Sequence, residues 1–535
     1  MIVKDALDDA SVLVCYDSYC FSFFSTGVVN IISPGIWTNR IIICANRACL
    51  TFMSNQQLST VKMIINGERK LSVSGETYEV RNPATSDGLE RVPKGAREDA
   101  KAAIDAAYDA FGKWSSTRPI ERAKLILKAA EIVESQKAEI ARLITLENGK
   151  PLPDAMGEME WVLNTMRSEA YANVRLFGDY SQSRPGQYAY RKIEPIGVCG
   201  VLLPFNNPGI QWACQVPVGL VTGNTLVIKP ASTTPLAEYK LLEALVKAGL
   251  PAGVANYVIG PGNTVGEEIV ASPKTHMISL TGENETGVKI MQAAAPEMKR
   301  LSLNLGGSDP LVVCDDGDIA AAISFGVHNR FRNTGQGCMC VKRVFVFEGV
   351  YETYLQKYLE ETRKWTVGNG LSPNVKMGPV HTANGRATTE SQVKNAIGGG
   401  AKLEAGGRRP EGKEYEKGFF YLPTVLTNAS YESKVAQQET FGPVVPIWKV
   451  KDIEEAIVRA NDSPFGLTGT IFTSDLKKAN KFVEEHISSF NRVNPVPSAI
   501  TDFEGFGRIY VKKSGYGTEG TEAYTRKRPA VINAH

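Results

Sequence analysis

From residue 197 onward, short uncharged runs alternate with helix-like stretches, and this alternation constrains the fold more than any other feature of the chain. Continuous apolar runs occur at residues 197–204, 226–230, 256–260 and 276–280. Such runs are typical of parallel strands that are buried on both faces. Apolar residues at helical spacing separate them at 235–248 and 264–271. The alternation predicts a doubly wound parallel sheet with right-handed crossovers, which binds ligands at the carboxyl ends of its strands.

A second set of alternating segments follows Gly307. We expect strands at 311–314, 344–347 and 442–447, with helices at 318–331, 350–365 and 453–460. Ahead of the first set, the sequence predicts a hairpin at 63–69 and helices at 97–114 and 117–148. A chain of 535 residues has room for two or three domains. The predicted fold is therefore α/β, with two doubly wound α/β domains, of which the first has a Rossmann-like, nucleotide-binding architecture.

The composition is that of an ordinary globular protein, with 43% hydrophobic and 22% charged residues. A net charge of +3, with Lys and Arg scattered, argues against a nucleic-acid partner. The nine cysteines do not resemble a disulfide framework and favour a reducing, cytoplasmic location. The five histidines lack metal-ligand spacing, and Cys338-x-Cys340 has no second pair, so we expect no metal.

Residues 1–62 differ from the rest of the chain. The stretch 20–37 carries no charge, but Ser, Gly, Asn and Pro interrupt it, so we expect no membrane span. The acidic start lacks the basic residues of a secretory signal. We expect a poorly ordered extension, or a translation start placed upstream of Met53 or Met63.

Residues 333–338 read N-T-G-Q-G-C and provide the candidate nucleophile, Cys338. Glycines on both sides of Gln336 allow a loop to aim the cysteine into a cleft, and a thiolate is a strong nucleophile. A lone cysteine is more often a buried structural residue. Here N-x-G-Q-x-C followed by a basic residue resembles the nucleophile loop of the aldehyde dehydrogenase superfamily, and the resemblance extends in motif order over about residues 63–532.

Residues 204–208, P-F-N-N-P, resemble the P-W-N-F-P motif of that family. The resemblance implies that the side chain of Asn206 and the backbone N–H of Cys338 form an oxyanion hole. An asparagine before proline can also simply form a turn. The implied reaction oxidises an aldehyde through a cysteine thiohemiacetal and a thioester, with hydride transfer to NAD or NADP.

Three further motifs are similar to the family's cofactor-binding elements. Residues 229–232, K-P-A-S, imply that Lys229 binds the adenosine ribose, and the uncharged Ser232 would tolerate the 2′-phosphate of NADP. Residues 282–287, from Gly282 through Glu283 to Gly287, occupy the place of a pyrophosphate-binding helix start. Residues 439–443 resemble E-x-F-G-P, which implies that Glu439 holds the nicotinamide ribose and that Phe441 packs beside the nicotinamide.

Two residues depart from the family pattern. Asn304 stands where the family has the glutamate that activates water, and Gln215 stands where a lysine is usual. Because an amide is no general base near neutral pH, we expect slow deacylation, with Glu283 and Glu439 as candidate substitutes for the base. These departures also leave open a CoA-acylating semialdehyde dehydrogenase, or a catalytically impaired homologue that only binds.

The resemblance also implies which residues line the substrate tunnel, namely Asn207, Gln211 and Arg332. Their polarity predicts a small polar or anionic aldehyde, because a guanidinium can hold a carboxylate or phosphate in a bidentate pair. Alternatively, Arg332 points to solvent or pairs with a helix carboxylate.

The same resemblance predicts how the chain is divided. Residues 63–176 and 196–306 would form the NAD(P)-binding domain, and 307–505 the catalytic domain. Residues 177–195 and 506–535 would form a β arm, with 180–194 pairing with 530–533, that joins subunits into a homodimer or homotetramer.

Overall fold

The computed structural model describes residues 58–174, 178–496 and 509–533, together with four short strands before residue 42. The chain forms two compact units, Met1–Ser59 and Thr60–His535. In the first unit, β1 (Leu13–Tyr16) pairs with β2 (Tyr19–Ser22), and β3 (Val29–Asn30) pairs with β4 (Arg40–Ile41). The expectation of a poorly ordered extension falls largely outside the described residues.

The first sheet of the second unit has the predicted parallel core. Its strands lie in the order β23 (Gly515–Tyr516), β15 (Arg300–Asn304), β14 (Met277–Thr281), β11 (Val198–Leu202), β12 (Thr225–Lys229), β13 (Ala255–Tyr257), β5 (Met63–Ile65) and β6 (Glu68–Lys70). The five strands from β15 to β13 are parallel. At the edges, antiparallel pairs join β23 to β15, β5 to β13 and β6 to β5. Because β12 and β14 lie on opposite sides of β11, the strand order reverses there. Ligands of doubly wound sheets bind at such a reversal.

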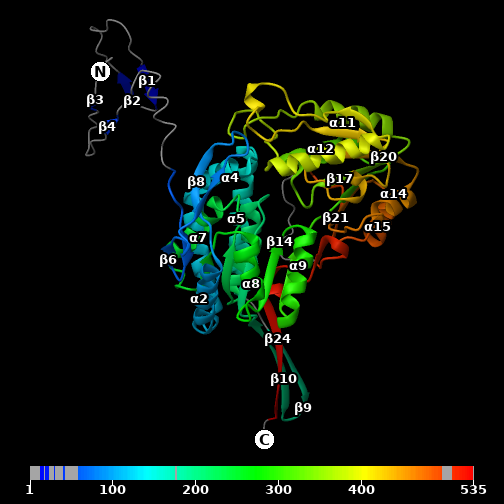
Figure 1. Ribbon diagram of the computed structural model, residues 1–535. Helices are drawn as coiled ribbons and strands as arrows, with labels where there is room; N and C mark the ends of the chain where they lie inside the picture. The colour runs from blue at the N-terminus through cyan, green and yellow to red at the C-terminus, as the bar shows by residue number, and fades with distance from the viewer. Residues whose placement is uncertain are drawn as a thin grey trace. The chain divides into compact units, whose positions relative to one another are not determined.

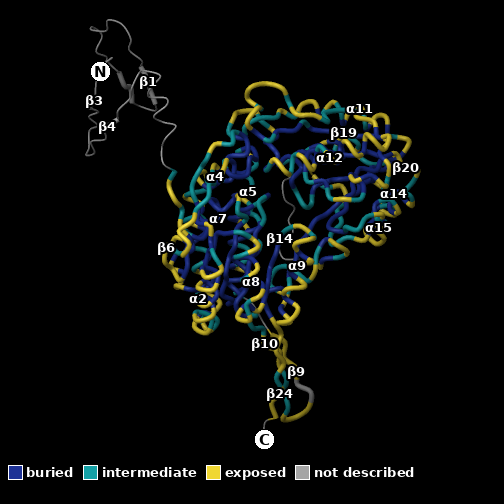
Figure 2. Tube along the Cα trace, in the orientation of Figure 1, coloured by how far each residue is buried: buried dark blue, intermediate teal, exposed yellow. Residues whose placement is uncertain are grey.

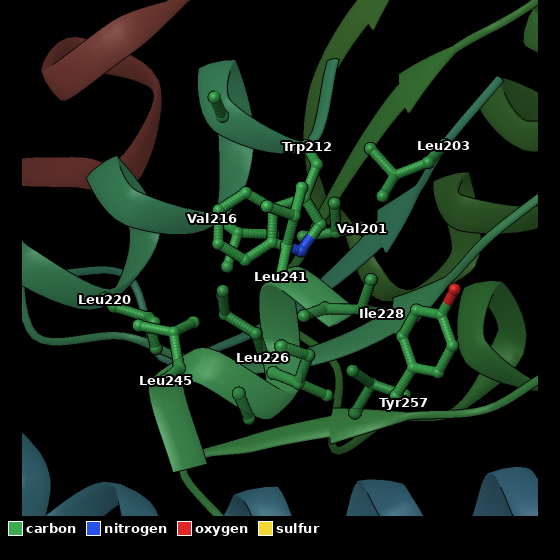
Figure 3. Packing of buried hydrophobic residues seen from close by; sticks show 14 of the residues in the cluster. Val201, Leu203, Trp212, Val216, Leu220, Leu226, Ile228, Leu241, Leu245 and Tyr257 are labelled. Atoms are coloured by element: carbon green, nitrogen blue, oxygen red, sulfur yellow. The ribbon is translucent and has the colours of Figure 1, made fainter. Parts of the chain in front are cut away.

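Continuous burial explains why these strands form as the sequence predicts. Every residue of β11, β12 and β14 is buried, which requires cover on both faces. Figure 3 shows Trp212 and Val216 of α6 (Pro208–Val221) and Leu241 of α7 (Leu236–Ala248) packed with Val201 and Ile228 of the strands. The remaining helices of this half are α2 (Arg97–Ser115), α3 (Pro119–Ser135), α4 (Lys137–Asn148), α5 (Leu152–Asn173), α8 (Glu267–Ala271) and α9 (Asn284–Ala294).

A second, mostly parallel sheet follows β15 along the chain. Its order is β18 (Lys402–Ala405), β19 (Thr424–Thr427), β20 (Val444–Val450), β17 (Val341–Phe347), β16 (Asp309–Val313), β21 (Thr468–Phe472) and β22 (Phe490–Val493). Only the β18–β19 pair is antiparallel. Its helices are α10 (Ile319–Phe331), α11 (Tyr351–Thr362), α12 (Ala383–Gly398), α13 (Lys434–Gln437), α14 (Ile453–Asn461) and α15 (Leu476–Glu485), several of which are labelled in Figure 1. The prediction of two doubly wound α/β parts is confirmed.

A three-stranded antiparallel ribbon extends away from both sheets (Figure 1). It contains β9 (Asp179–Arg184), β10 (Gln187–Pro195) and β24 (Thr525–Asn533), and the predicted pairing of the last two segments is present, with Tyr190 opposite Ala530. Much of this ribbon is exposed, whereas the interiors of the two sheets are buried (Figure 2). Not all of 506–533 joins it, because β23 extends the first sheet and α16 (Gly520–Tyr524) packs on α6. The division into domains and the role of the ribbon remain predictions.

A separate hairpin, β7 (Thr77–Arg81) with β8 (Gly88–Pro93), lies outside these three sheets. Among the described residues, no helix combines the length and apolar character needed to cross a membrane.

Candidate active site

The loop that carries Cys338 is held in an unusual backbone conformation. Asn333 and Thr334 have φ of 48° and 60°, in the left-handed region that a β-branched residue rarely adopts. Thr334 Oγ1 donates to Gly378 O at 3.0 Å, and Asn333 Nδ2 donates to Asn206 O at 2.7 Å. Gly335, at φ 69°, could not carry a side chain, because its Cβ would lie 2.4 Å from Gly442 O. Of the two glycines that flank Gln336, Gly335 therefore adopts a backbone conformation that needs glycine, whereas Gly337 does not have a positive φ.

Asn206 lies against this loop, as the sequence predicts. The loop from β11 to α6 carries it, and its Nδ2 donates to the carbonyl of Gln336 at 3.0 Å. Its own carbonyl accepts from Asn148 at 3.3 Å as well as from Asn333. Asn206 is buried and Cys338 is partly exposed. The structure thus brings the two predicted oxyanion residues to one place, although their catalytic roles remain predictions.

A buried lysine lies beneath the nucleophile loop. Lys342 Nζ donates to the carbonyls of Gly337 at 2.8 Å and Cys338 at 2.6 Å, and lies 3.2 Å from Glu439 Oε1. Burial lowers the pKa of Lys342, but Cys340, Glu439, Asp309 and Cys338 outweigh it and raise the pKa above its usual value. Sequence reasoning noted a basic residue here but assigned it no role.

Two neighbouring groups complete this side of the loop. Cys340 Sγ donates to Gly337 O at 3.0 Å and accepts from Arg330 Nη1 at 3.2 Å. Arg330 is fully buried and also donates to the carbonyls of Val341 at 3.1 Å and Thr440 at 3.1 Å. Arg330 therefore ties the nucleophile loop to the segment that contains Glu439 and Phe441.

Glu439 and Phe441 lie beside the nucleophile loop and the Asn206 segment. Glu439 Oε1 accepts from Gly307 N at 3.1 Å, and any Cβ on Gly306 would lie 2.2 Å from Glu439 Oε2. Phe441 meets Phe205 edge-on at 5.9 Å between ring centroids. His381 stacks on Phe205, with 4.3 Å between the ring centroids and 10° between the ring planes. Burial lowers the pKa of His381 to about 4, so this ring is neutral near pH 7.

The carboxyl end of β12 carries the predicted adenosine-ribose residues. Lys229 is buried, its Nζ donates to Pro230 O at 2.9 Å, and burial lowers its pKa to about 8 against the opposing effect of Glu238. Ser232 Oγ donates to Gly260 O at 3.2 Å. Ser232 lines an open cavity of about 590 Å³ together with Arg91 and Lys94. Glu76 also lines this cavity and pairs with Lys94 at 2.8 Å, so its wall carries charges of both signs. A cavity of this size fits the ribose of a dinucleotide.

Helix α9 begins at the predicted pyrophosphate segment. Glu283 is its exposed N-cap residue and makes no side-chain cap hydrogen bond. Gly282 N donates to Asn304 O at 3.0 Å, and Asn284 Oδ1 accepts from Gly306 N at 3.2 Å. Gly287 is buried, and a Cβ there would lie 2.7 Å from Leu305 Cδ1. A helix N-terminus fixed at the end of β14 suits a pyrophosphate, which fits the prediction.

Asn304, at the end of β15, contacts a carboxylate that sequence reasoning did not find. Asn304 Nδ2 donates to Glu519 Oε1 at 3.3 Å, and Tyr510 donates to the same oxygen. The buried Oδ1 of Asn304 has no hydrogen-bond partner among the described residues. Gln215 bonds elsewhere, accepting from Ser279 at 2.6 Å. The carboxylate at Asn304 therefore comes from Glu519, near the C-terminus, rather than from Glu283 or Glu439.

The three predicted substrate residues have different surroundings. Asn207 Oδ1 accepts from Lys150 Nζ at 2.8 Å, and Lys150 pairs with Glu158 at 2.6 Å in a buried ion pair. Gln211 is buried, and its Oε1 accepts from Thr281 at 2.9 Å. Arg332 Nε lies 3.9 Å from Asp154 Oδ1 of α5. The alternative of pairing with a helix carboxylate is thus the arrangement seen for Arg332.

The catalytic and cofactor candidates lie at one edge of each sheet. Lys229, Gly282 and Asn304 lie at the carboxyl ends of strands in the first sheet. Gly307, Cys338 and Glu439 precede strands of the second sheet, at its amino edge. This arrangement is typical of a nucleotide-dependent enzyme with a cysteine nucleophile.

Comparison with known proteins defines the family. The model of the aldehyde dehydrogenase family matches residues 71–528, and the chain belongs to this family. It is 36% identical to the betaine aldehyde dehydrogenase of Bacillus subtilis over 493 residues, covering 88% of this chain and 98% of that protein. It is 34% identical to the NADP⁺-dependent succinate-semialdehyde dehydrogenase of Escherichia coli over 476 residues, covering 88% and 96%.

A solved structure agrees with this assignment. The fold is similar to that of a point mutant of betaine aldehyde dehydrogenase from Staphylococcus aureus in complex with NAD⁺. The TM-score is 0.86 at 30% identity, over 90% of this chain and 98% of that one. The resemblance inferred from the motifs is therefore confirmed.

Proposed function

We propose that the protein is an NAD(P)-dependent aldehyde dehydrogenase that oxidises a small polar aldehyde to its carboxylic acid through Cys338. The observation that carries this proposal is the hydrogen bond from Asn206 Nδ2 to the loop of Cys338. It holds an amide donor beside the nucleophile, close to Phe441, which contacts Phe205, and to Glu439, which pairs with Lys342. Family membership and the order of the motifs support the same reaction.

The proposed chemistry begins at the Cys338 thiolate, which forms a C–S bond to the aldehyde carbon. The carbonyl oxygen becomes an oxyanion, and Asn206 Nδ2 with the Cys338 N–H would stabilise it. A nicotinamide cofactor held by Glu439 and Phe441 would supply the hydride acceptor, so that the oxyanion on Cys338 could collapse to a thioester. Water then attacks the thioester, the C–S bond breaks, and the acid and the thiolate are released. Overall, the aldehyde, water and oxidised cofactor give acid, reduced cofactor and one proton.

The residues that would hold the cofactor fit either NAD or NADP. Lys229 and Ser232 would bind the adenosine ribose, the start of α9 the pyrophosphate, and Glu439 with Phe441 the nicotinamide end. Ser232 bears no charge, and Arg91 lines the adjacent cavity together with the Lys94–Glu76 ion pair. The uncharged Ser232 supports binding of a 2′-phosphate, because a carboxylate in its place would repel it. Among the relatives, the E. coli enzyme is named for NADP⁺, whereas the S. aureus structure holds NAD⁺.

Deacylation needs a base, and Glu519 is the best-placed candidate. Its carboxylate accepts from Asn304, the residue that replaces the usual glutamate. Glu283 is an exposed N-cap residue, and Glu439 pairs with Lys342, so neither shows a comparable contact with Asn304. We therefore assign Glu519 as the base for water, with Asn304 as the residue that positions it.

The surroundings of Asn207 support a polar substrate more than a strongly anionic one. Each cation near it has a carboxylate partner, Lys150 with Glu158 and Arg332 with Asp154. The relatives do not decide the charge, because the name of one specifies a betaine aldehyde and that of the other succinate semialdehyde. Arg332 would bind an anionic aldehyde only if the substrate replaced Asp154 as its ion-pair partner.

An aldehyde panel tests this proposal. Initial rates of NAD(P)H formation would be measured with glyceraldehyde, succinic semialdehyde, betaine aldehyde and butyraldehyde, with NAD⁺ or NADP⁺, with and without CoA. We expect CoA-independent oxidation, with glyceraldehyde ahead of butyraldehyde. Turnover only with CoA would identify an acylating dehydrogenase. This alternative is considered because Asn304 replaces the usual glutamate. Cofactor binding without turnover of any aldehyde would identify a binding-only homologue.

The panel can be repeated with Arg332→Leu. If the guanidinium binds an anionic substrate, kcat/KM for succinic semialdehyde should fall about tenfold or more relative to butyraldehyde, equivalent to about 1.4 kcal/mol or more. An equal loss for every aldehyde would assign Arg332 only to its contact with Asp154.

We further propose that the ribbon of β9, β10 and β24 joins subunits into a homodimer or homotetramer. Tyr180 and Val531 expose 68% and 62% of their surface on this ribbon, and a contact between subunits would cover them.

A further inference from the structure

We propose that Lys342 is a positioning residue that orients the backbone of Cys338, binds Glu439 and favours the thiolate form of Cys338. This inference rests on the proposed function, in which Cys338 is the nucleophile and Glu439 holds the cofactor. It concerns a residue inside the second sheet, at the second position of β17, whose side chain reaches back to the loop that precedes the strand.

The contacts of Lys342 saturate its ammonium group. The side chain is fully buried, and its Nζ has three oxygen partners, Gly337 O at 2.8 Å, Cys338 O at 2.6 Å and Glu439 Oε1 at 3.2 Å. An ammonium has three N–H donors, so each donor has one acceptor. Burial of an unpaired ammonium would be costly, and this set of partners removes that cost.

These bonds fix the direction of the Cys338 N–H. In a trans peptide the C=O of one residue and the N–H of the next point in opposite directions. Because Lys342 holds the Gly337 carbonyl, it directs the N–H of Cys338 away from itself. That N–H is one of the two donors assigned to the oxyanion, so Lys342 would set its orientation without touching the substrate.

The charges around Cys338 give Lys342 a second effect. Four ionisable groups near Lys342 raise its pKa: Asp309 on β16, Glu439 before β20, and Cys338 and Cys340 in the loop. Arg330 of α10 donates a hydrogen bond to Cys340. The two thiols and two carboxyls together raise the pKa of Lys342. Since such interactions are mutual, the ammonium favours the thiolate of Cys338. It thereby provides a cation for activating the nucleophile.

Lys342 also links the nucleophile Cys338 to Glu439, the residue assigned to the nicotinamide ribose. Glu439 Oε1 accepts from both Lys342 and Gly307 N, which fixes the carboxylate for a ribose hydroxyl. A single buried cation thus connects the residue assigned to the cofactor with the backbone of the nucleophile.

The test measures the pH dependence of Cys338 alkylation by iodoacetamide in the free enzyme, with the Cys338 peptide quantified by mass spectrometry. The variants are Lys342→Met, Lys342→Arg and, as a matched control, Lys299→Met, which removes a buried lysine outside the nucleophile loop and the cofactor site. In Lys342→Met we expect the apparent pKa of Cys338 to rise by about one unit or more, so alkylation near neutral pH slows about tenfold. Lys342→Arg should restore most of the reactivity, and Lys299→Met should match the wild type.

Glu439→Gln should shift the apparent pKa of Cys338 in the opposite direction. This variant therefore tests the role of Lys342 even if Lys342→Met fails to fold. Removing the carboxylate leaves the charge of Lys342 less compensated, so the apparent pKa of Cys338 should fall. An unchanged pKa in folded Lys342→Met, or a raised pKa in Glu439→Gln, would overturn the role of Lys342. Absence of aldehyde oxidation by a wild-type enzyme whose Cys338 reacts at low pH would instead overturn the proposed function alone.

Discussion

Asn304 shows how far single residues can be read from the sequence. Its identity at the position of the usual glutamate predicts slow deacylation, and that reasoning needs only the motif. The partner, Glu519, lies 215 positions further along the chain, and only the pairing of β15 with β23 brings it near. Lys342 was overlooked for a related reason: a lysine in an apolar strand gives no sign of which backbone carbonyls it will reach.

The pairing of Asn304 with Glu519 predicts separate effects on the two halves of the reaction. Acylation and hydride transfer do not need this base, so wild type should give a burst of NAD(P)H before the steady rate. Glu519→Gln should keep the burst and lower the steady rate about tenfold or more, because a general base contributes on the order of 10²–10⁴ in rate. Asn304→Glu should raise the steady rate more than the burst.

Stopped-flow absorbance at 340 nm distinguishes these outcomes. A Glu519→Gln variant with an unchanged steady rate would show that another group activates water. A wild-type enzyme without a burst would show that deacylation is not the slow step.

Secondary-structure elements were the most predictable part of the chain. The buried strands β11, β12 and β14 were expected from apolar runs, and each appears within a few residues of the predicted bounds. The 117–148 stretch was expected as one helical region, but α3 and α4 divide at Gln136. Helical periodicity continues across the break, so the pattern of apolar residues alone did not reveal it. The left-handed Thr334 was equally unpredictable, because tertiary hydrogen bonds stabilise it.

The end of β12 supports a pH prediction for cofactor binding. Burial lowers the pKa of Lys229 to about 8, so its ammonium is present below that pH and is lost as pH rises through it. If the ammonium binds the ribose or its phosphate, the Kd for NADP⁺ should rise between pH 7 and pH 9. Lys229→Arg should flatten this dependence, because a guanidinium stays charged over that range.

Fluorescence titration of the cofactor at several pH values measures this effect. As a control for the 2′-phosphate, Ser232→Glu should weaken NADP⁺ more than NAD⁺. A Kd that does not change with pH in wild type would remove the charge of Lys229 from cofactor binding.

At the scale of the whole molecule, the pairing of β10 with β24 joins segments more than 300 positions apart. The pairing of these two segments is expected from the family resemblance and is present in the structure, with Tyr190 opposite Ala530. Periodicity alone would not have found this pairing, because a polar ribbon has no buried face that specifies its register.

The exposed apolar residues of the ribbon make oligomerisation testable. Val531→Asp should shift the protein from dimer or tetramer toward monomer, since a charge would have to be buried at the contact. Val73→Asp is a matched control, because Val73 is 70% exposed outside the ribbon. Light scattering coupled to size exclusion gives the mass of each variant. A monomeric wild type, or equal masses for wild type and Val531→Asp, would contradict this role for the ribbon.

The central claim is that Cys338 is the nucleophile of an aldehyde oxidation, and single-turnover kinetics of Cys338→Ser test it most directly. Enzyme in excess over an active aldehyde would be mixed with NAD(P)⁺, and NAD(P)H formation followed, with cofactor affinity measured by separate titration. We predict that Cys338→Ser forms no aldehyde-dependent NAD(P)H yet binds the cofactor as wild type does. Wild-type single-turnover kinetics in Cys338→Ser would contradict the claim.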